Sequence, residues 1–205
     1  MKHFLKIVAT FLLLASMVSV AGCRADQTDE KPSETLSYEG VVLSDCVRLG
    51  AYEGLTVTLS SSDADRGEAV WEAVRSGCEV LQYPEAAVAY YVAQAEARCR
   101  YYAKENDVDE EAAMAALGTS RDEIAADAKR RVAEDLIVLA VQADAGISLT
   151  EDEKTRLFDK YADKYVADFG YDREYVKENL ADLVYESMLY DKTTEYLILK
   201  NTFVK

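Results

Sequence analysis

The chain has 205 residues, half of them hydrophobic, and a formal net charge of −15 at neutral pH. An acidic surface repels phosphate backbones and anionic lipid headgroups, so this composition disfavours nucleic acid as a partner. Its single histidine is His3 and its cysteines lack metal-ligand spacing, so we expect no metal site.

Residues 1–22 have the layout of a secretory signal peptide. Lys2, His3 and Lys6 form a basic start, residues 4–20 are mostly apolar, and the small residues Ala21 and Gly22 follow. An uncleaved anchor helix is the alternative, but small residues at this border suit a peptidase. The pattern therefore predicts export.

The four residues Val20-Ala21-Gly22-Cys23 resemble the lipobox of bacterial lipoproteins. The resemblance implies that Cys23 carries acyl chains such as palmitate, becomes the mature N-terminus, and anchors the protein to the outer face of the cell membrane. Loss of the leader leaves 21 basic against 38 acidic residues, a net charge of −17.

The next two segments separate the anchor from the helical part. Residues 23–37 are rich in charged and hydroxyl side chains, which predicts a flexible tether. Residues 38–62 predict a short β connector of one or two strands, with a hairpin as one arrangement. In it Leu55, Val57 and Leu59 alternate with polar residues, as in a half-buried strand, and glycines mark the turns.

Residues 63–205 predict a mainly α fold of helices joined by short turns. The first helix is expected near residues 68–80, and a proline-started helix near 84–106. Ser120 with Glu123 and Thr150 with Glu153 have the spacing of capping boxes. The remaining expected helices cover residues 109–117, 121–145, 151–169 and 172–200.

These helices are long for a chain of this size, which suggests arms. A helix of about 20 to 28 residues spans roughly 30 to 40 Å. From Tyr83 onward, "YPEAAVAYYVAQAEARCRYYAKENDVDEEAAMAALG" and "SRDEIAADAKRRVAEDLIVLAVQADAGISLTEDE" resemble the C-terminal chaperone domain of trigger factor. The same order of elements occurs in parvulin-linked (SurA-like) chaperones of the periplasm.

Upstream, "VRLGAYEGLTVT" resembles the connector that follows the ribosome-binding domain of trigger factors. The sequence departs from that family in two places. A signal and a tether stand where the ribosome-binding domain would be, and the stretch from Leu59 to Tyr83 is too short for a prolyl isomerase domain. The resemblance therefore implies the chaperone body without those two domains.

The resemblance implies an ATP-independent chaperone that binds unfolded or exported polypeptides through apolar surfaces between helical arms. We expect no enzymatic activity and no cofactor, since serine-nucleophile motifs and phosphate loops are missing from the sequence. Two alternatives stay open: a surface-anchored module that binds or assembles one partner, and a prolyl isomerase. The oligomeric state is not determined by the sequence.

Aromatic and Met side chains on the predicted helices are the candidate client contacts, because tyrosine offers a broad apolar face with a polar tip. An apolar stripe at helical spacing is more often core. Adjacent tyrosines point about 100° apart, so one of each pair is expected to be buried. The candidates are Tyr90, Tyr91, Tyr101, Tyr102, Phe158, Tyr161, Tyr165, Phe169, Tyr185 and Met188.

Three cysteines besides Cys23 remain in the exported part, Cys46, Cys78 and Cys99. A Cys46–Cys78 disulfide is compatible with an exported protein, and buried free thiols are the alternative. The sequence does not decide between them.

Overall fold

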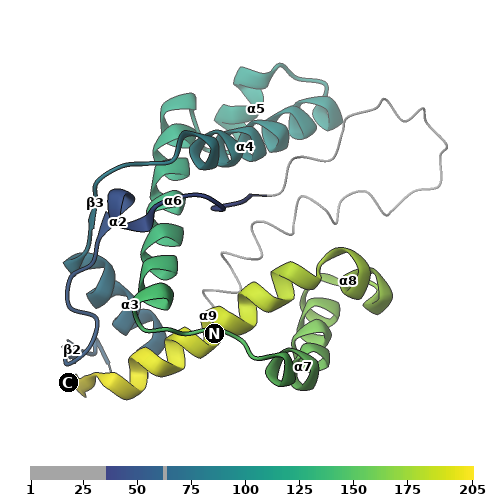
Figure 1. Cartoon of the computed structure of the whole chain (residues 1–205). Helices are drawn as coiled ribbons and strands as arrows, with labels where there is room; N and C mark the ends of the chain where they lie inside the picture. Colours follow the sequence, from purple (N-terminus) through teal and green to yellow (C-terminus); the bar gives the residue numbers. More distant parts are fainter. Residues whose placement is uncertain (1–35, 62–63) are drawn as a thin grey trace. The chain divides into compact units, whose positions relative to one another are not determined.

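The computed structural model describes residues 36–61 and 64–205 (Figure 1). The predicted signal peptide, the predicted lipidation site Cys23 and most of the predicted tether lie outside the described residues. Within them the chain forms eight helices and four strands of two or three residues. This confirms a mainly α fold; three of the short strands lie before residue 81, and the fourth lies at residues 202–204.

The prediction of strands alone in residues 38–62 is wrong, because the short helix α2, Leu43–Cys46, forms there. The later helices follow the predicted order up to residue 169, with most ends within a few residues of the expected ones. The helices are α2 Leu43–Cys46, α3 Arg66–Gly77, α4 Glu85–Asn106, α5 Glu110–Ala116, α6 Arg121–Asp144, α7 Glu151–Phe169, α8 Arg173–Asn179 and α9 Ala181–Lys200. The strands are β1 Val47–Arg48, β2 Thr56–Thr58, β3 Glu79–Val80 and β4 Thr202–Val204.

The described chain divides into two compact units. The α9 unit consists of residues 49–61, 64–77 and 141–205, and the α4 unit of residues 36–48 and 78–140. The boundary lies inside α6, whose last four residues belong to the α9 unit. This boundary differs from the predicted one between the β connector (38–62) and the helical domain (63–205), because β2 of the connector and α3 of the helical domain belong to the same unit.

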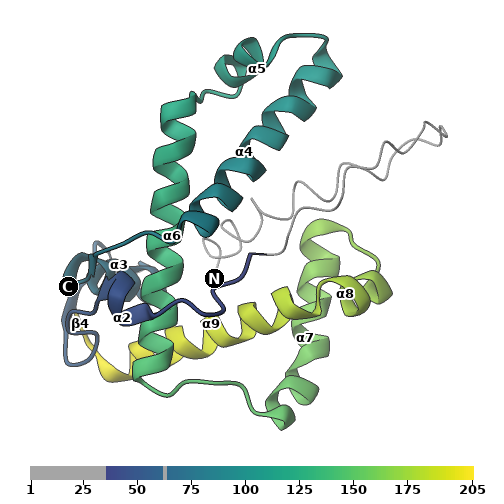
Figure 2. The same ribbon diagram turned by 45° about the horizontal axis from the view of Figure 1, so that its top comes forward.

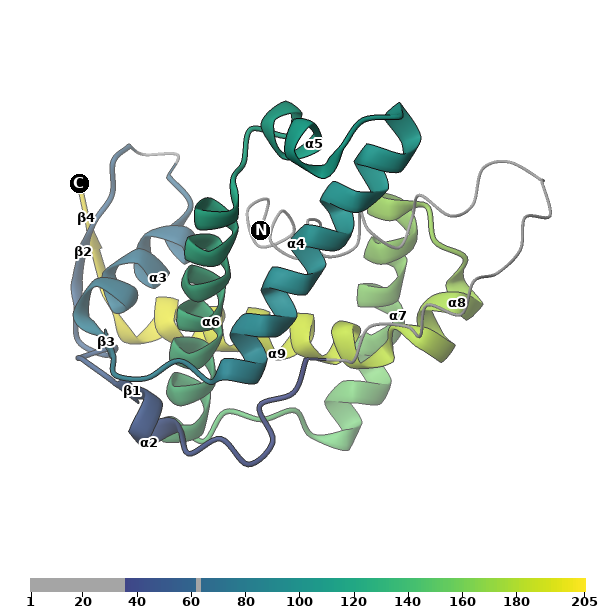
Figure 3. The same ribbon diagram turned by 90° about the horizontal axis from the view of Figure 1, so that it is seen from above.

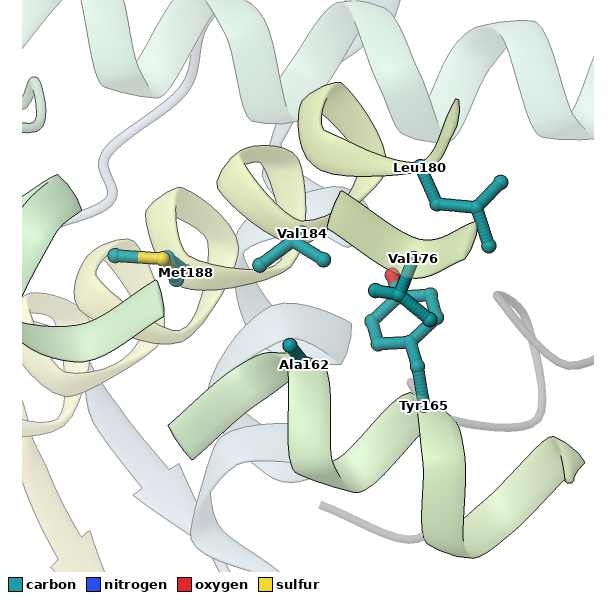
Figure 4. Packing of buried hydrophobic residues seen from close by; sticks show 6 residues of the cluster. All are labelled: Ala162, Tyr165, Val176, Leu180, Val184 and Met188. Carbon is teal, nitrogen blue, oxygen red and sulfur yellow. The ribbon is translucent and has the colours of Figure 1, made fainter. Parts of the chain in front are cut away.

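The core of the α9 unit lies where α7, α8 and α9 meet (Figure 4). Thr150 and Glu153 form the predicted capping box at the start of α7, and Gly170 ends this helix in the left-handed conformation that favours glycine. The buried members of the core are Ala162, Tyr165, Val176, Leu180, Val184 and Met188. α7 therefore begins and ends where its capping residues predict, and α8 begins at the position that Asp172 predicts.

The predicted single helix over residues 172–200 is wrong, because the chain bends at Leu180. That residue has φ −122° and ψ 13°, which separates α8 from α9. The bend allows Val176 on α8 and Val184 on α9 to pack into the same core as Leu180 itself. Neither glycine nor proline stands at this position, so the sequence carries no signal for the break.

The predicted alternation around Val57 is confirmed, but a hairpin within residues 38–62 is wrong. Val57 is buried in β2 between two exposed threonines. β2 pairs in parallel with the C-terminal strand β4, and β1 pairs antiparallel with β3 (Figure 3). Strands this short satisfy their backbone groups with whatever segment the tertiary structure places beside them.

In the α4 unit, α5 lies across the ends of α4 and α6 (Figure 2). A small apolar cluster holds this end together, with Cys99, Met114 and Ile124 at its centre. Ser120 starts α6 as predicted, since its Oγ donates to the Glu123 carboxylate at 2.8 Å and accepts from the Glu123 amide at 3.3 Å. Pro84 occupies the N-cap of α4, one position before the predicted one.

Candidate functional site

The predicted client contacts are distributed over both units. Tyr90, Tyr91, Tyr101 and Tyr102 lie on α4, whereas the other six lie on α7 and α9. Each group is described within its own unit below.

Three of the predicted contacts are core residues, so the prediction that they face a client is wrong. Tyr91, Tyr165 and Met188 are all buried. The Tyr165 hydroxyl bonds Ser187 Oγ at 2.7 Å and donates to the Leu183 carbonyl at 3.1 Å, and Met188 packs in the same core. Their helical spacing gave no means of separating them from exposed neighbours.

Four rings of the α9 unit form a continuous series, here named the aromatic row. The centroids of Tyr165 and Phe169 are 5.8 Å apart, and those of Phe169 and Tyr171 are 6.2 Å apart. Tyr171 then stacks on Tyr175 at 5.6 Å with an interplanar angle of 16°. The row leads from the buried ring of Tyr165 to Tyr175, which is 42% exposed.

Tyr171 and Tyr175 were missed by sequence reasoning. Tyr171 lies in the turn after α7, outside the predicted helices, whereas Tyr175 in α8 lies within the predicted helix 172–200 but was not among the candidates. Their four-residue spacing next to Gly170 was the available signal. Burial and, to a lesser extent, the neighbouring Tyr175 raise the pKa of Tyr171.

Polar contacts hold the aromatic row in place. Arg173 at the start of α8 pairs with Asp159 at 2.9 Å and with Asp163 at 2.8 Å, both on α7. Asp172 accepts hydrogen bonds from the Glu174 and Tyr175 amides and so caps α8. The outer two rings therefore sit on a short helix that is fastened to α7 as well as packed on it.

The other candidates of the α9 unit are half-buried and have defined partners. Phe158 and Tyr185 contact each other with centroids 5.5 Å apart. The Tyr161 hydroxyl donates to Asp191 at 2.8 Å, and the Lys164 ammonium lies 4.2 Å from the centre of the Tyr161 ring. Burial and this hydrogen bond raise the pKa of Tyr161. The cation covers one face of that ring, which leaves it less apolar surface for a client.

On α4 the candidates differ in exposure. Tyr101 is 40% exposed, whereas Tyr90 and Tyr102 are half-buried. Tyr90 contacts the buried Tyr91 edge to face at 5.5 Å, so this pair divides as predicted. Neither Tyr101 nor Tyr102 is buried, so the prediction that one of each pair is buried is wrong for this second pair.

A polar node in the α4 unit was not predicted. The hydroxyls of Tyr38 and Tyr91 both donate to Oδ2 of Asp135, each at 2.7 Å. Burial raises the pKa of Asp135, and the two tyrosine hydrogen bonds oppose that rise. Burial and the nearby carboxylate raise the pKa of both tyrosines. The three residues are far apart in sequence, so no local pattern joins them.

Cys46, Cys78 and Cys99 are free thiols, so the structure contains no Cys46–Cys78 disulfide. The register of β1 and β3 pairs Val47 with Val80, and the Leu81 amide donates to the Cys46 carbonyl at 2.8 Å. Cys46 therefore lies opposite Leu81, three positions along the ladder from Cys78. At about 3.4 Å per residue this offset exceeds the 4.4–6.8 Å Cα separation that a disulfide requires.

Among residues 36–61 and 64–205, none of the helices combines the length and the apolar composition of a membrane-spanning segment. The same part of the chain contains no group of three or more His, Cys, Asp or Glu side chains that could hold a metal ion. No protein-family model, curated protein or solved structure matches the chain.

Proposed function

We propose that the protein is an ATP-independent chaperone that binds unfolded or newly exported polypeptides outside the cytoplasm. The observation that supports this best is the aromatic row, in which half-buried and exposed rings continue outward from a packed core. Tyr101 on α4 adds an exposed ring in the other unit. Because the aromatic row is packed into the core at Tyr165 and exposed at Tyr175, its outer rings can contact an apolar segment of a client while the chaperone itself stays folded.

The expected binding is weak and reversible. Burial of apolar surface contributes about 25 cal/mol per Å², and association loses several kcal/mol of translational and rotational freedom. A contact of a few hundred Å² therefore leaves a small net affinity. The acidic character of the chain, with 38 acidic against 23 basic residues, favours solubility while these rings are exposed.

The location is part of the proposal. The lipobox-like residues before Cys23 would place the chaperone on the outer face of a bacterial cell membrane, where exported chains emerge. Metabolic labelling with a palmitate analogue in a lipoprotein-processing host tests this. We expect label on the wild type and none on Cys23→Ser; equal labelling of the two would contradict lipidation at this residue.

Suppression of aggregation tests the binding activity. A chemically denatured client is diluted into buffer with the full-length protein, and light scattering is followed. We expect suppression at stoichiometric amounts and a clear loss of it in the Tyr171→Ser, Tyr175→Ser double variant. Leu199→Ser is the matched control, because Leu199 is an apolar side chain of the same unit, 83% exposed, outside the aromatic row.

Wild-type protein that leaves scattering unchanged would refute the chaperone proposal. If the double variant and Leu199→Ser behaved alike, binding would not depend on the aromatic row. A panel of unrelated unfolded clients separates a chaperone from a module dedicated to one partner, since only a chaperone should capture most of the panel.

A further inference from the structure

Within the α4 unit, the Tyr38 side chain links the first described residues of the chain to α6. Residues 38–41 form a tight turn in which the Val41 amide donates to the Tyr38 carbonyl at 3.1 Å. Gly40 has φ +78°, a left-handed conformation that glycine adopts without strain. The turn thus fixes the backbone from which the Tyr38 side chain reaches α6.

The Tyr38 hydroxyl donates its hydrogen bond to the same carboxylate oxygen as the Tyr91 hydroxyl does. Asp135 Oδ2 therefore joins three segments that are distant in sequence: the N-terminal segment, α4 and α6. All three side chains are buried or part-buried, and a hydrogen bond to a carboxylate is stronger than one between neutral groups. Asp135 Oδ2 is therefore satisfied by two protein hydroxyls in place of water.

This is also the first long-range hydrogen bond met along the described residues, starting from the N-terminal side. The next ones belong to the β1–β3 pair, including the Leu81 amide bond to Cys46. Between them lie residues 39–45, of which Val42 is exposed. A pulling force on the N-terminal end of the described chain would therefore act on the Tyr38–Asp135 hydrogen bond before it acts on the β1–β3 pair.

We propose that Tyr38 and Asp135 form a latch that fastens residues 36–41, the strap, to α6, and that release of the latch loosens the strap together with its internal turn while β1 and β3 stay paired. Opening gives water access to the Asp135 carboxylate and the Tyr91 hydroxyl that bonds it. If Cys23 carries lipid, as proposed above, this latch is where the anchor's tether joins the folded protein. The latch itself does not depend on lipidation.

Hydrogen exchange followed by mass spectrometry on the full-length protein in detergent tests the latch. Tyr38→Phe removes the hydroxyl and keeps the ring. We expect peptides covering residues 36–45 to exchange roughly ten- to a hundredfold faster, the factor for a lost hydrogen bond to a charged group. Peptides over residues 46–48 and 79–82 should keep wild-type rates, because the strand pair stays closed.

Tyr91→Phe is the matched control, since it removes the other hydrogen bond to Asp135 Oδ2 and leaves the Tyr38 bond in place. We expect it to leave exchange in residues 36–45 within about threefold of wild type. Unchanged exchange of the strap in Tyr38→Phe would overturn the latch. Equal acceleration of the strap and the β1–β3 peptides would overturn it as well, because the strap would then not open separately.

Discussion

The indole N–H of Trp71 on α3 donates a hydrogen bond to Thr194 Oγ1 on α9 at 2.8 Å. The same indole ring stacks on Tyr190 with centroids 5.4 Å apart. These contacts fasten the helix that follows the β connector to the C-terminal helix. They explain why residues 64–77 fold with the end of the chain.

Replacement of Trp71 by Phe should destabilise the α9 unit. The variant loses one buried hydrogen bond and part of a large buried side chain, for an expected loss of about 1–3 kcal/mol in the free energy of unfolding. Urea denaturation followed by circular dichroism measures it. Leu199→Ser should stay within about 0.5 kcal/mol of wild type, as an exposed substitution does. Equal stability of wild type and Trp71→Phe would contradict the importance of this contact.

Gly50 and Gly77 offer a paired test of backbone packing. A Cβ at Gly50 would lie 2.2 Å from the Gly77 carbonyl oxygen, whereas a Cβ at Gly77 would meet nothing closer than 3.9 Å. Gly50→Ala should therefore lower the free energy of unfolding by about 1–3 kcal/mol or more. Gly77→Ala, at the end of α3, should be neutral or stabilising by up to about 1 kcal/mol. Thermal melts that rank the two variants in the opposite order would refute the close approach.

Thiol reactivity should distinguish the three cysteines in the described part of the chain. Cys78 is half-buried, whereas Cys46 and Cys99 are buried, and burial raises the pKa of Cys99. In Cys23→Ser protein we expect Ellman's reagent to modify Cys78 first and the other two only after denaturant is added. Non-reducing peptide mapping should show no Cys46–Cys78 bridge, and detection of one would contradict the strand register.

Asp135 should make stability depend on pH. Because its pKa in the folded protein is raised above the ordinary 3.8, its contribution is fully present below that value. The contribution is lost as the pH rises through the folded pKa. Relative to wild type, Asp135→Asn should therefore gain stability between mildly acidic and neutral pH. Chemical denaturation at several pH values measures this, and parallel curves for the two proteins would contradict it.

Glu153 should act in the opposite direction. The Lys192 ammonium, at 2.7 and 2.8 Å from the two carboxylate oxygens, and the Thr150 amide lower the pKa of Glu153 from 4.5 to about 2. Its contribution to stability is present above pH 4.5 and is lost as the pH falls to about 2. Both Glu153→Gln and Lys192→Met should flatten the acid limb of the stability curve. A variant with an unchanged acid limb would show that the pair is not coupled to folding.

Much of the helical pattern could be predicted because its signals are local. Thr150, Ser120 and Asp172 each bond an amide within three residues, so the side chain that starts the helix also marks its position in the sequence. The alternation around Val57 likewise identifies a buried strand residue without naming the partner strand. The candidate site was predicted in part, since Phe169 belongs to the aromatic row but the exposed end at Tyr175 was not foreseen.

The sequence by itself determined the side-chain-capped helix starts, the glycine-ended turns and the mainly α class, because the caps and turns depend on contacts within one turn of backbone. Only the tertiary structure decided that the chain bends at Leu180, that β2 pairs with the last strand, and that Tyr91 and Tyr165 are buried while Tyr101 and Tyr175 are not. Hydrophobic burial is non-directional, so identical tyrosines at helical spacing differ only in what distant segments place against them.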